Sequence, residues 1–418
     1  MKHISPFFRV RKMCLLIVIL LISTSCLKSD KPGLPEEVIR TYSETGFNRI
    51  EFTKTIGKFI DDAGDSIQLQ AAYFLIAKMR SHYMVTYDVT DTSGAIYQID
   101  PFMFTSGDSL LAHWKKLDSI HGGLHYQPDR FVLDTDTIKS ELLISTIQQT
   151  MKSQKPEWHG LYDKETVFQY VLPYRIANEA VEDWRSQLAD TFPELLYFSA
   201  QTYEPDIIIE NINEFVNSRF IFDKRFIKQA TIQPLADLLR NRVGNYEDLA
   251  HLKVKLLRMC GIPATIDYTP YLADSVNSFV WAVAMNSDRK FQPLLSEETK
   301  YLFERSNYFP KVYRRIFHEN NSSLFRLKPI SLTTPPFLGH YDYLDVTQDY
   351  VDVIQLQYEQ VSPDTLLYLT VLNDKKWRAV DFAISADNQF VFNNIASNIT
   401  LRPAILNQDH FIFPDEMK

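Results

Sequence analysis

The 418-residue sequence is poor in glycine and cysteine, with 12 and 3 residues respectively. The glycines make up about 3% of the chain, against an average of roughly 7%. None of them forms the G-x-G-x-x-G or Walker-type loop that binds phosphate groups, and no C-x-x-C, H-E-x-x-H or G-x-S-x-G motif occurs. These absences exclude the commonest nucleotide, zinc, redox and serine-hydrolase motifs, so we expect neither a cofactor nor a bound metal.

An excess of basic residues is also missing. The 52 acidic residues outnumber the 44 basic ones, which gives a formal net charge of −8 and argues against a nucleic-acid partner. The hydrophobic share of 45% and the charged share of 23% are typical of a globular chain. At roughly 100–200 residues per domain, the length predicts two to four domains.

The first 26 residues are typical of a bacterial secretion signal. Basic residues precede an apolar run over 14–22, which is shorter than the roughly 20 residues that a membrane-spanning helix requires. The sequence STSC, which ends at Cys26, resembles a lipobox, in which the thiol becomes lipid-modified. We therefore predict a signal peptide at 1–25 and a lipidated Cys26 with a tether at 26–40. The membrane is then a partner through a lipid anchor, and the protein belongs to the cell envelope, on the periplasmic or surface face of the outer membrane. The alternative is an ordinary signal peptide in which Cys26 has no role.

The remaining sequence predicts an α+β fold with three parts. Residues 41–200 show mainly helical periodicity, which predicts a helical N-terminal region. Residues 201–330 mix helical and strand patterns, including strands over 264–271 and 279–285, and predict an α+β core. Between 331 and 418 apolar and polar residues alternate, which predicts an antiparallel β-sandwich-like domain.

Two local features of these parts are specific enough to compare with a structure. Residues 167–185 are expected to be helical with a break at Pro173, so that Arg175 and Glu179 lie one turn apart and pair on the surface. In the C-terminal part, Asn373-Asp374 separates two alternating runs and predicts a tight turn.

Residues 244–263 predict a well-specified buried helix that leads into a strand. Asn245 is suited to cap the start of the helix, and Glu247 and Asp248 in the first turn suit the positive end of its dipole. Gly261 suits the left-handed stop, with Pro263 just beyond it.

The same stretch resembles the transglutaminase-like (papain-like thiol) family. Its pattern G-x-C-x-D-x-A-x-L, R-x-x-G-I-P and H-x-W is matched here in register by Gly244, Asp248, Ala250, Leu252, Arg258, Gly261-Ile262-Pro263 and Trp281. Further motifs, such as LPYRIANEAVEDWR and YDYLDVTQDY, resemble lipid-anchored members from Bacteroidota. The resemblance implies a transglutaminase-like α+β core, in which a cysteine at the helix N-terminus attacks an amide carbonyl with the help of a histidine and an acidic residue.

The catalytic positions of that pattern are vacant in this sequence. Tyr246 occupies the place of the nucleophile, Phe279 that of the histidine, and Gln292 approximately that of the acidic third residue. A phenol with a pKa of about 10 is a poor nucleophile at neutral pH without a base. Cys260 cannot substitute, because it lies 14 residues along the same helix, about 21 Å from its start. We therefore expect a pseudoenzyme with no catalytic residues.

Three functions follow from this interpretation and stay open. The first is a lipid-anchored binding or scaffold protein whose ligand is a peptide, a glycan or another envelope protein. Tyr246, Phe279 and Trp281 then either line a cleft or fill the space of a lost catalytic site. The second is a cysteine-independent, divergent amide-directed hydrolase or transferase of the same fold. The third is carbohydrate or protein binding through the C-terminal β domain.

Overall fold

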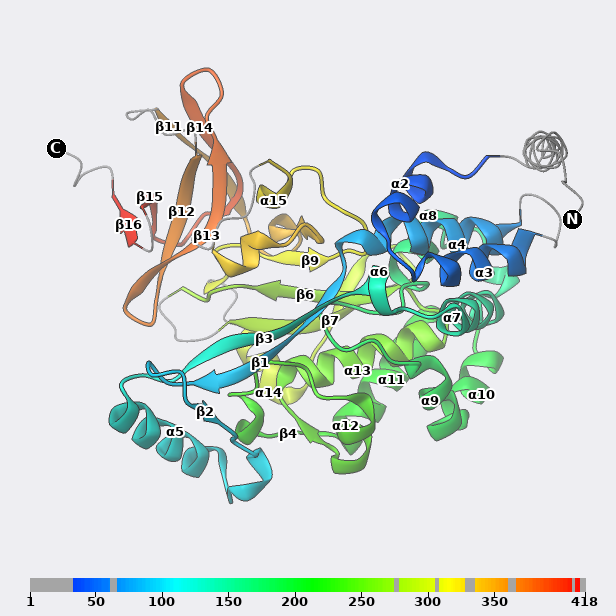
Figure 1. Cartoon of the computed structure of the whole chain (residues 1–418), viewed down its shortest axis with the longest axis horizontal. Helices are drawn as coiled ribbons and strands as arrows, with labels where there is room; N and C mark the ends of the chain where they lie inside the picture. The colour runs from blue at the N-terminus through cyan, green and yellow to red at the C-terminus, as the bar shows by residue number, and fades with distance from the viewer. Residues whose placement is uncertain are drawn as a thin grey trace, which may run out of the picture.

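The computed structural model describes residues 33–60, 66–273, 278–304, 308–327, 335–359, 366–407 and 410–413. It has the predicted α+β fold, with helices gathered in the N-terminal half and strands at the C-terminal end (Figure 1). The predicted signal peptide and Cys26 lie outside the described residues.

Most helices of the N-terminal region pack against one another around a common apolar core, whereas the helix at Gly107–His121 lies apart and contacts residues 224–226 (Figure 1). Ser66 is the N-cap of helix α4: its hydroxyl accepts a hydrogen bond from the Leu69 N–H at 3.2 Å. The helices of this region are α2 (Glu36–Glu44), α3 (Arg49–Ile60), α4 (Ile67–Lys78), α5 (Gly107–His121), α6 (Asp134–Thr137), α7 (Ser140–Ser153), α8 (Lys164–Tyr170), α9 (Trp184–Thr191) and α10 (Pro193–Gln201).

A three-stranded antiparallel sheet interrupts this helical region, which the sequence prediction missed. Its order is β2 (Ile96–Tyr97), β1 (Tyr83–Thr90) and β3 (His125–Leu133), and Figure 1 shows it crossing the middle of the molecule. The partners β1 and β3 are separated by the whole of α5, so their pairing leaves no local signal in the sequence.

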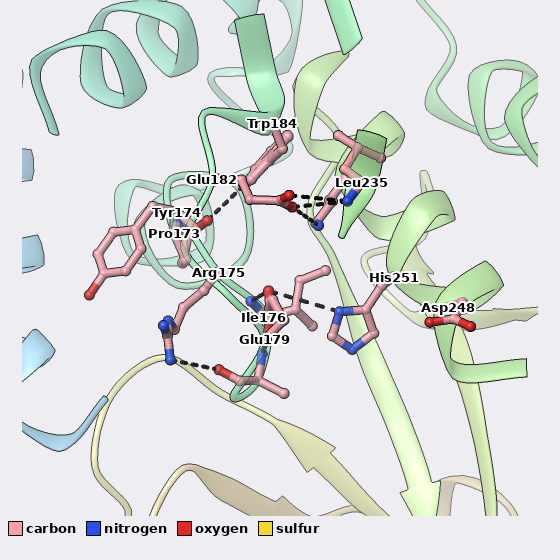
Figure 2. Close-up of polar contacts among 12 residues, drawn as sticks. Pro173, Tyr174, Arg175, Ile176, Glu179, Glu182, Trp184, Leu235, Asp248 and His251 are labelled. Carbon is pink, nitrogen blue, oxygen red and sulfur yellow. Dashed lines mark hydrogen bonds and ion pairs between the residues drawn. The ribbon is translucent and has the colours of Figure 1, made fainter. Parts of the chain in front are cut away.

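The segment between α8 and α9 is irregular, so the predicted helix over 167–185 is wrong in its second half. Arg175 is buried and pairs with Asp134 at 2.9 Å instead of with Glu179 on a surface. Glu179 accepts hydrogen bonds from the backbone N–H groups of Ile176 and Ala177 at 2.6 and 2.7 Å (Figure 2). The spacing of four in the sequence therefore reflects a turn that is closed by its own carboxylate.

The centre of the molecule is a five-stranded antiparallel sheet with helices α11 and α13 stacked on one face (Figure 1). The strands at 264–271 and 279–285 are confirmed as β6 and β7. The sheet order is β10 (Tyr343–Asp345), β9 (Tyr313–Arg315), β6 (Ala264–Thr269), β7 (Phe279–Met285) and β8 (Phe291–Leu294). The helices near it are α11 (Pro205–Arg219), α12 (Leu235–Asn241), α13 (Tyr246–Met259), α14 (Glu297–Glu304) and α15 (Leu324–Leu327).

The C-terminal strands form two antiparallel sheets that share an apolar core, in keeping with a sandwich. They are β11 (Val353–Glu359) with β14 (Gln389–Ala396), and β13 (Lys376–Ile384), β12 (Leu366–Asn373), β15 (Leu401–Asn407) and β16 (His410–Ile412). The predicted turn joins β12 and β13, and both of its central residues, Asp374 and Lys375, have positive φ, as a tight hairpin requires. Strand β10 lies beyond the expected boundary at 330 and yet pairs with β9 of the central sheet.

Candidate functional site

Helix α13 begins with a capping box, in which the side chains of Asn245 and Asp248 each accept a hydrogen bond from the other residue's backbone N–H. The Asn245 side chain accepts a hydrogen bond from the Asp248 N–H, and the Asp248 carboxylate accepts one from the Asn245 N–H, both at 2.9 Å. Gln233 donates from Nε2 to the same carboxylate at 2.8 Å. A Cβ at Gly244 would lie 2.8 Å from the Asp248 Cβ, so this position requires glycine. Gly244 and Asp248 of the family pattern therefore have structural roles here.

Aromatic rings pack together at the N-terminus of α13, around the position that the family pattern assigns to a nucleophile. The two-residue strands β4 (Ile221–Phe222) and β5 (Val243–Gly244) pair in parallel and bring Phe222 alongside the helix start. The rings of Phe222 and Tyr246 stack with their centroids 3.8 Å apart and their planes 5° apart. Phe279 meets the Tyr246 ring edge-on at 6.1 Å. Burial and the charge of Glu298 raise the pKa of the Tyr246 hydroxyl, which leaves it protonated at neutral pH.

Phe279 and Trp281 belong to a buried aromatic cluster on one face of β7. Each side chain is 2% exposed, and Phe309 lies against both rings, stacked on Trp281 at 5.4 Å. Tyr246 is half-buried at the margin of this cluster. The burial favours the interpretation in which these rings fill the core over the one in which they line a cleft.

Gln292 does not join the other two vacant positions. It lies on β8 opposite Ala284, five residues along β7 from Phe279. Ala284 packs into the core on the other face of the strand, whereas Phe279 and Trp281 belong to the aromatic cluster. The structure therefore brings together Tyr246, Phe279 and Trp281, and places Gln292 apart from them.

A buried polar network contacts the aromatic cluster at Trp281. Trp281 donates from Nε1 to the Tyr350 hydroxyl at 3.2 Å, and that hydroxyl donates to Asp267 at 2.5 Å. Arg314 binds the Asp267 carboxylate with two hydrogen bonds, of 2.9 and 2.8 Å. Burial alone would lower the pKa of Arg314, but the ion pair outweighs it, and the pKa is raised above its usual value.

Sequence analysis missed Arg314 and Tyr350 as members of this network. A fully buried carboxylate requires a charged or hydrogen-bonding partner, so Asp267 within the apolar strand ATIDYT was the available signal. The sequence contains no local pattern that says which distant residue supplies the partner.

An acid–base pair lies deeper along α13 but is unsuited to proton transfer at Tyr246. His251 Nδ1 lies 3.8 Å from Glu179 Oε1, and Figure 2 shows the ring directed at the turn that Glu179 closes. Burial lowers the pKa of His251 to about 4. Burial would raise the pKa of Glu179, but neighbouring cations, His251 first, lower it to about 2. At neutral pH the pair is thus a neutral imidazole beside a carboxylate. Within the described part of the chain, no hydrogen bond links Tyr246 to a titratable side chain.

Cys260 lies at the other end of α13 from Tyr246. Its side chain is 2% exposed, and burial raises the pKa of the thiol to about 12. The group is therefore a neutral thiol, which is a weak nucleophile.

A surface groove of about 430 Å³ adjoins the network at Tyr350. Its lining includes hydrogen-bonding side chains from two segments, among them Asp349, Asp352 and Asn398. Tyr350 lines this groove and also contacts Trp281, with ring centroids 5.3 Å apart, so the groove adjoins the aromatic cluster.

Among the described residues, no helix combines the length and the apolar character needed to cross a bilayer. The same residues contain no group of three or more histidine, cysteine, aspartate or glutamate side chains arranged to hold a metal ion.

Comparisons with known proteins give no family assignment. No family model matches the chain, and no curated protein matches it. A solved structure of a candidate cysteine protease from Cytophaga hutchinsonii is similar over 25% of this chain and 41% of its own length, with 18% sequence identity and a TM-score of 0.18. A TM-score this low carries no argument about function.

Proposed function

We propose that this chain is a lipid-anchored protein of the cell envelope whose transglutaminase-like core does no thiol chemistry and serves as a scaffold or binding protein. One observation carries the proposal: Phe222, Tyr246 and Phe279 close the helix N-terminus at which the related family has its nucleophile. A scaffold requires helix α13 with its capped start and the five-stranded sheet on which that helix packs, and the chain has both.

The catalytic part of the proposal is tested with the purified mature chain. The chain is incubated with glutamine-containing peptides and a primary amine for transfer, and with peptide and cell-wall amides for hydrolysis. We expect no turnover above the heat-denatured control from wild type, Tyr246→Ala or Cys260→Ser. Turnover that Tyr246→Ala abolishes would overturn the proposal.

The anchoring part rests on the signal sequence and on Cys26. We expect metabolic labelling with a fatty acid to mark the wild-type chain and to leave Cys26→Ser unmarked, with that variant lost from the membrane fraction. Equal membrane retention of the two forms, without label in either, would show an ordinary signal peptide.

A second candidate function, binding through the C-terminal β region, is favoured by the groove at Tyr350. The isolated segment 331–418 is a poor test, because it would carry β10 without its partner β9. Substitutions in the whole chain are better. We expect Asp352→Ala to weaken binding to a panel of defined oligosaccharides and peptides, and Glu359→Ala, an exposed residue on β11 outside the groove, to have no effect. Equal binding by wild type and both variants would remove the groove from consideration.

A further inference from the structure

A second cavity, of about 670 Å³, lies at the C-terminal end of α13, at the opposite end of the helix from the aromatic cluster. Residues of α7, α9, α10 and α13 line it. Its volume falls within the range of roughly 300–1,000 Å³ that is usual for small-molecule sites. Apolar and aromatic side chains form much of the wall, including Ala189, Leu196, Tyr197 and Met259.

Arg185 brings a buried positive charge to this cavity. The side chain is 2% exposed, and its Nη atoms donate to the backbone carbonyls of Val171, Leu172 and Arg258. Its Nε has no hydrogen-bond partner, and no ion pair with a carboxylate is formed within the described ranges. Burial and the nearby Arg258 lower the pKa of this guanidinium, which shows how poorly its charge is compensated.

Lys155 brings a second positive charge from the facing side. Its Nζ donates to the carbonyls of Ser199 and Thr202 and lies 4.3 Å from the centre of the Trp158 ring. Burial lowers the pKa of this ammonium group as well. Its contacts are neutral carbonyls and aromatic faces; Glu157 is near enough to act on the charge, but the two form no ion pair in the described structure.

The overall charge of the lining favours an anion. Lys152 adds a third cation at the rim, and Asp190 is the acidic residue of the lining. The carbonyls that Arg185 and Lys155 bind lie mostly at helix ends, and capping those ends would explain the Nη and Nζ contacts. Capping leaves the unpartnered Nε of Arg185 unexplained, and it does not account for an apolar cavity beside one buried and one half-buried cation.

We propose that this cavity binds an organic anion with an apolar body, such as an alkyl or aryl carboxylate. The acidic group lies between Arg185 and Lys155, and the hydrocarbon part lies against Leu196, Tyr197 and Met259. The Nη donors of Arg185 already bind backbone carbonyls, so Arg185 contributes its buried positive charge. Lys155 has a third N–H group beyond the two that bind carbonyls, and a charge-assisted hydrogen bond from it to a carboxylate is of a kind that is among the strongest in proteins. The inference is independent of the proposed function, since it concerns the other end of α13.

The test uses the mature chain and calorimetric titration with decanoate, with decanol as a neutral probe of the same chain length. We expect decanoate to bind at micromolar concentrations and decanol at least about tenfold more weakly, since a hydrogen bond to a charged group contributes about 1.5–3 kcal/mol. Equal affinity for the two probes, or no decanoate binding at millimolar concentration, would overturn the proposal.

Variants separate binding from folding. Lys155→Gln is expected to weaken decanoate binding at least about tenfold and Lys155→Arg to restore it, because the substitution to Gln removes a charged hydrogen bond.

Ala189→Trp, which fills the cavity from one wall, is expected to abolish binding while the circular dichroism spectrum is preserved. The matched control Lys116→Gln, an exposed lysine on α5, should bind as wild type does. Wild-type affinity in Ala189→Trp would place the ligand elsewhere. If Lys155→Gln fails to fold, the exposed Lys152→Gln replaces it, and unchanged affinity in that variant would count against the proposal.

Discussion

Tyr246 lies at the start of α13, and its neighbours decide what its side chain can do. Its ring lies between those of Phe222 and Phe279, and neither of these neighbours can accept a proton. A thiol at a helix N-terminus has a lowered pKa, but it still needs a partner that accepts and returns a proton.

We therefore expect Tyr246→Cys to show no amide hydrolysis or transfer, because Phe279 cannot act as the base. Product release from a glutamine-containing peptide measures this directly. The double variant Tyr246→Cys/Phe279→His serves as the comparison. Robust turnover by the single variant would reveal a base that the arrangement of rings does not provide.

Asp267 is the second residue whose environment decides its role. It is fully buried, and its charge is compensated by Arg314. Asp267→Asn leaves Arg314 with only the more exposed Asp349, at 3.6 Å, as a carboxylate partner, so we expect it to lower the free energy of unfolding by about 3 kcal/mol. Urea denaturation measures the change. Asp237→Asn, which breaks the exposed pair with Arg240, should change it by less than about 1 kcal/mol. Similar small effects of both substitutions would contradict the assigned role of Asp267.

His251 makes stability depend on pH. Its pKa is about 4 in the folded chain and about 6.5 when unfolded, so between these values the unfolded state binds a proton that the folded state does not. Stability therefore falls as the pH drops from 6.5 to 4, by on the order of 3 kcal/mol. His251→Gln should lose less stability over that interval than wild type, as measured by urea denaturation at several pH values. Parallel curves for the two proteins would rule this out.

At the scale of elements, helix α13 and strands β6 and β7 were predictable because their signals are local. Asn245 and Gly261 mark the helix ends, and the strands are short apolar runs. Strands β1 and β3 were missed because each depends on a partner about 40 residues away. The segment 171–183 was misread because a carboxylate that closes a turn has the same spacing as a helical pair.

Prediction of the site was limited for the same reason, because only residues within one local sequence pattern could be assigned to it. Tyr246, Phe279 and Trp281 could be placed together because one family pattern covers all three positions, within about 35 residues of sequence. Tyr350 and Arg314 could not, since they come from segments with no shared pattern.

Gly261 ends α13 in a way that allows a sharp test. Its φ is +83°, and an added Cβ would collide with the Ser153 carbonyl of α7. We expect Gly261→Ala to lower the free energy of unfolding by more than about 1 kcal/mol, because strain and the collision add. Gly57→Ala in the exposed middle of α3, where an added Cβ meets nothing within 4 Å, should instead raise it by about 0.5–1 kcal/mol. Thermal or urea unfolding of both variants gives the comparison, and effects of the same sign would contradict it.

At the scale of the whole molecule, Lys311 joins the central sheet to the C-terminal strands. It is almost fully buried, and its Nζ contacts Asp345 at 2.5 Å, Asp381 at 3.1 Å and the Asn393 carbonyl at 2.9 Å. These partners belong to β10, β13 and β14. One ammonium group thus compensates two carboxylates from different sheets.

We expect the central and C-terminal parts to unfold in a single calorimetric transition because they share this buried charge cluster. Lys311→Ala leaves two partly buried carboxylates, 27% and 15% exposed, without this cation and should lower stability by about 3 kcal/mol. Differential scanning calorimetry measures both effects. Two separate transitions in wild type would show that the two parts are energetically independent.

The cap at the start of α13 has a consequence for how such sequences evolve. Gly244 and Asp248 are held by steric fit and backbone hydrogen bonding, and neither interaction involves the side chain of Tyr246. A chain under selection only to fold would therefore keep Gly244 and Asp248, whichever residue stands at position 246.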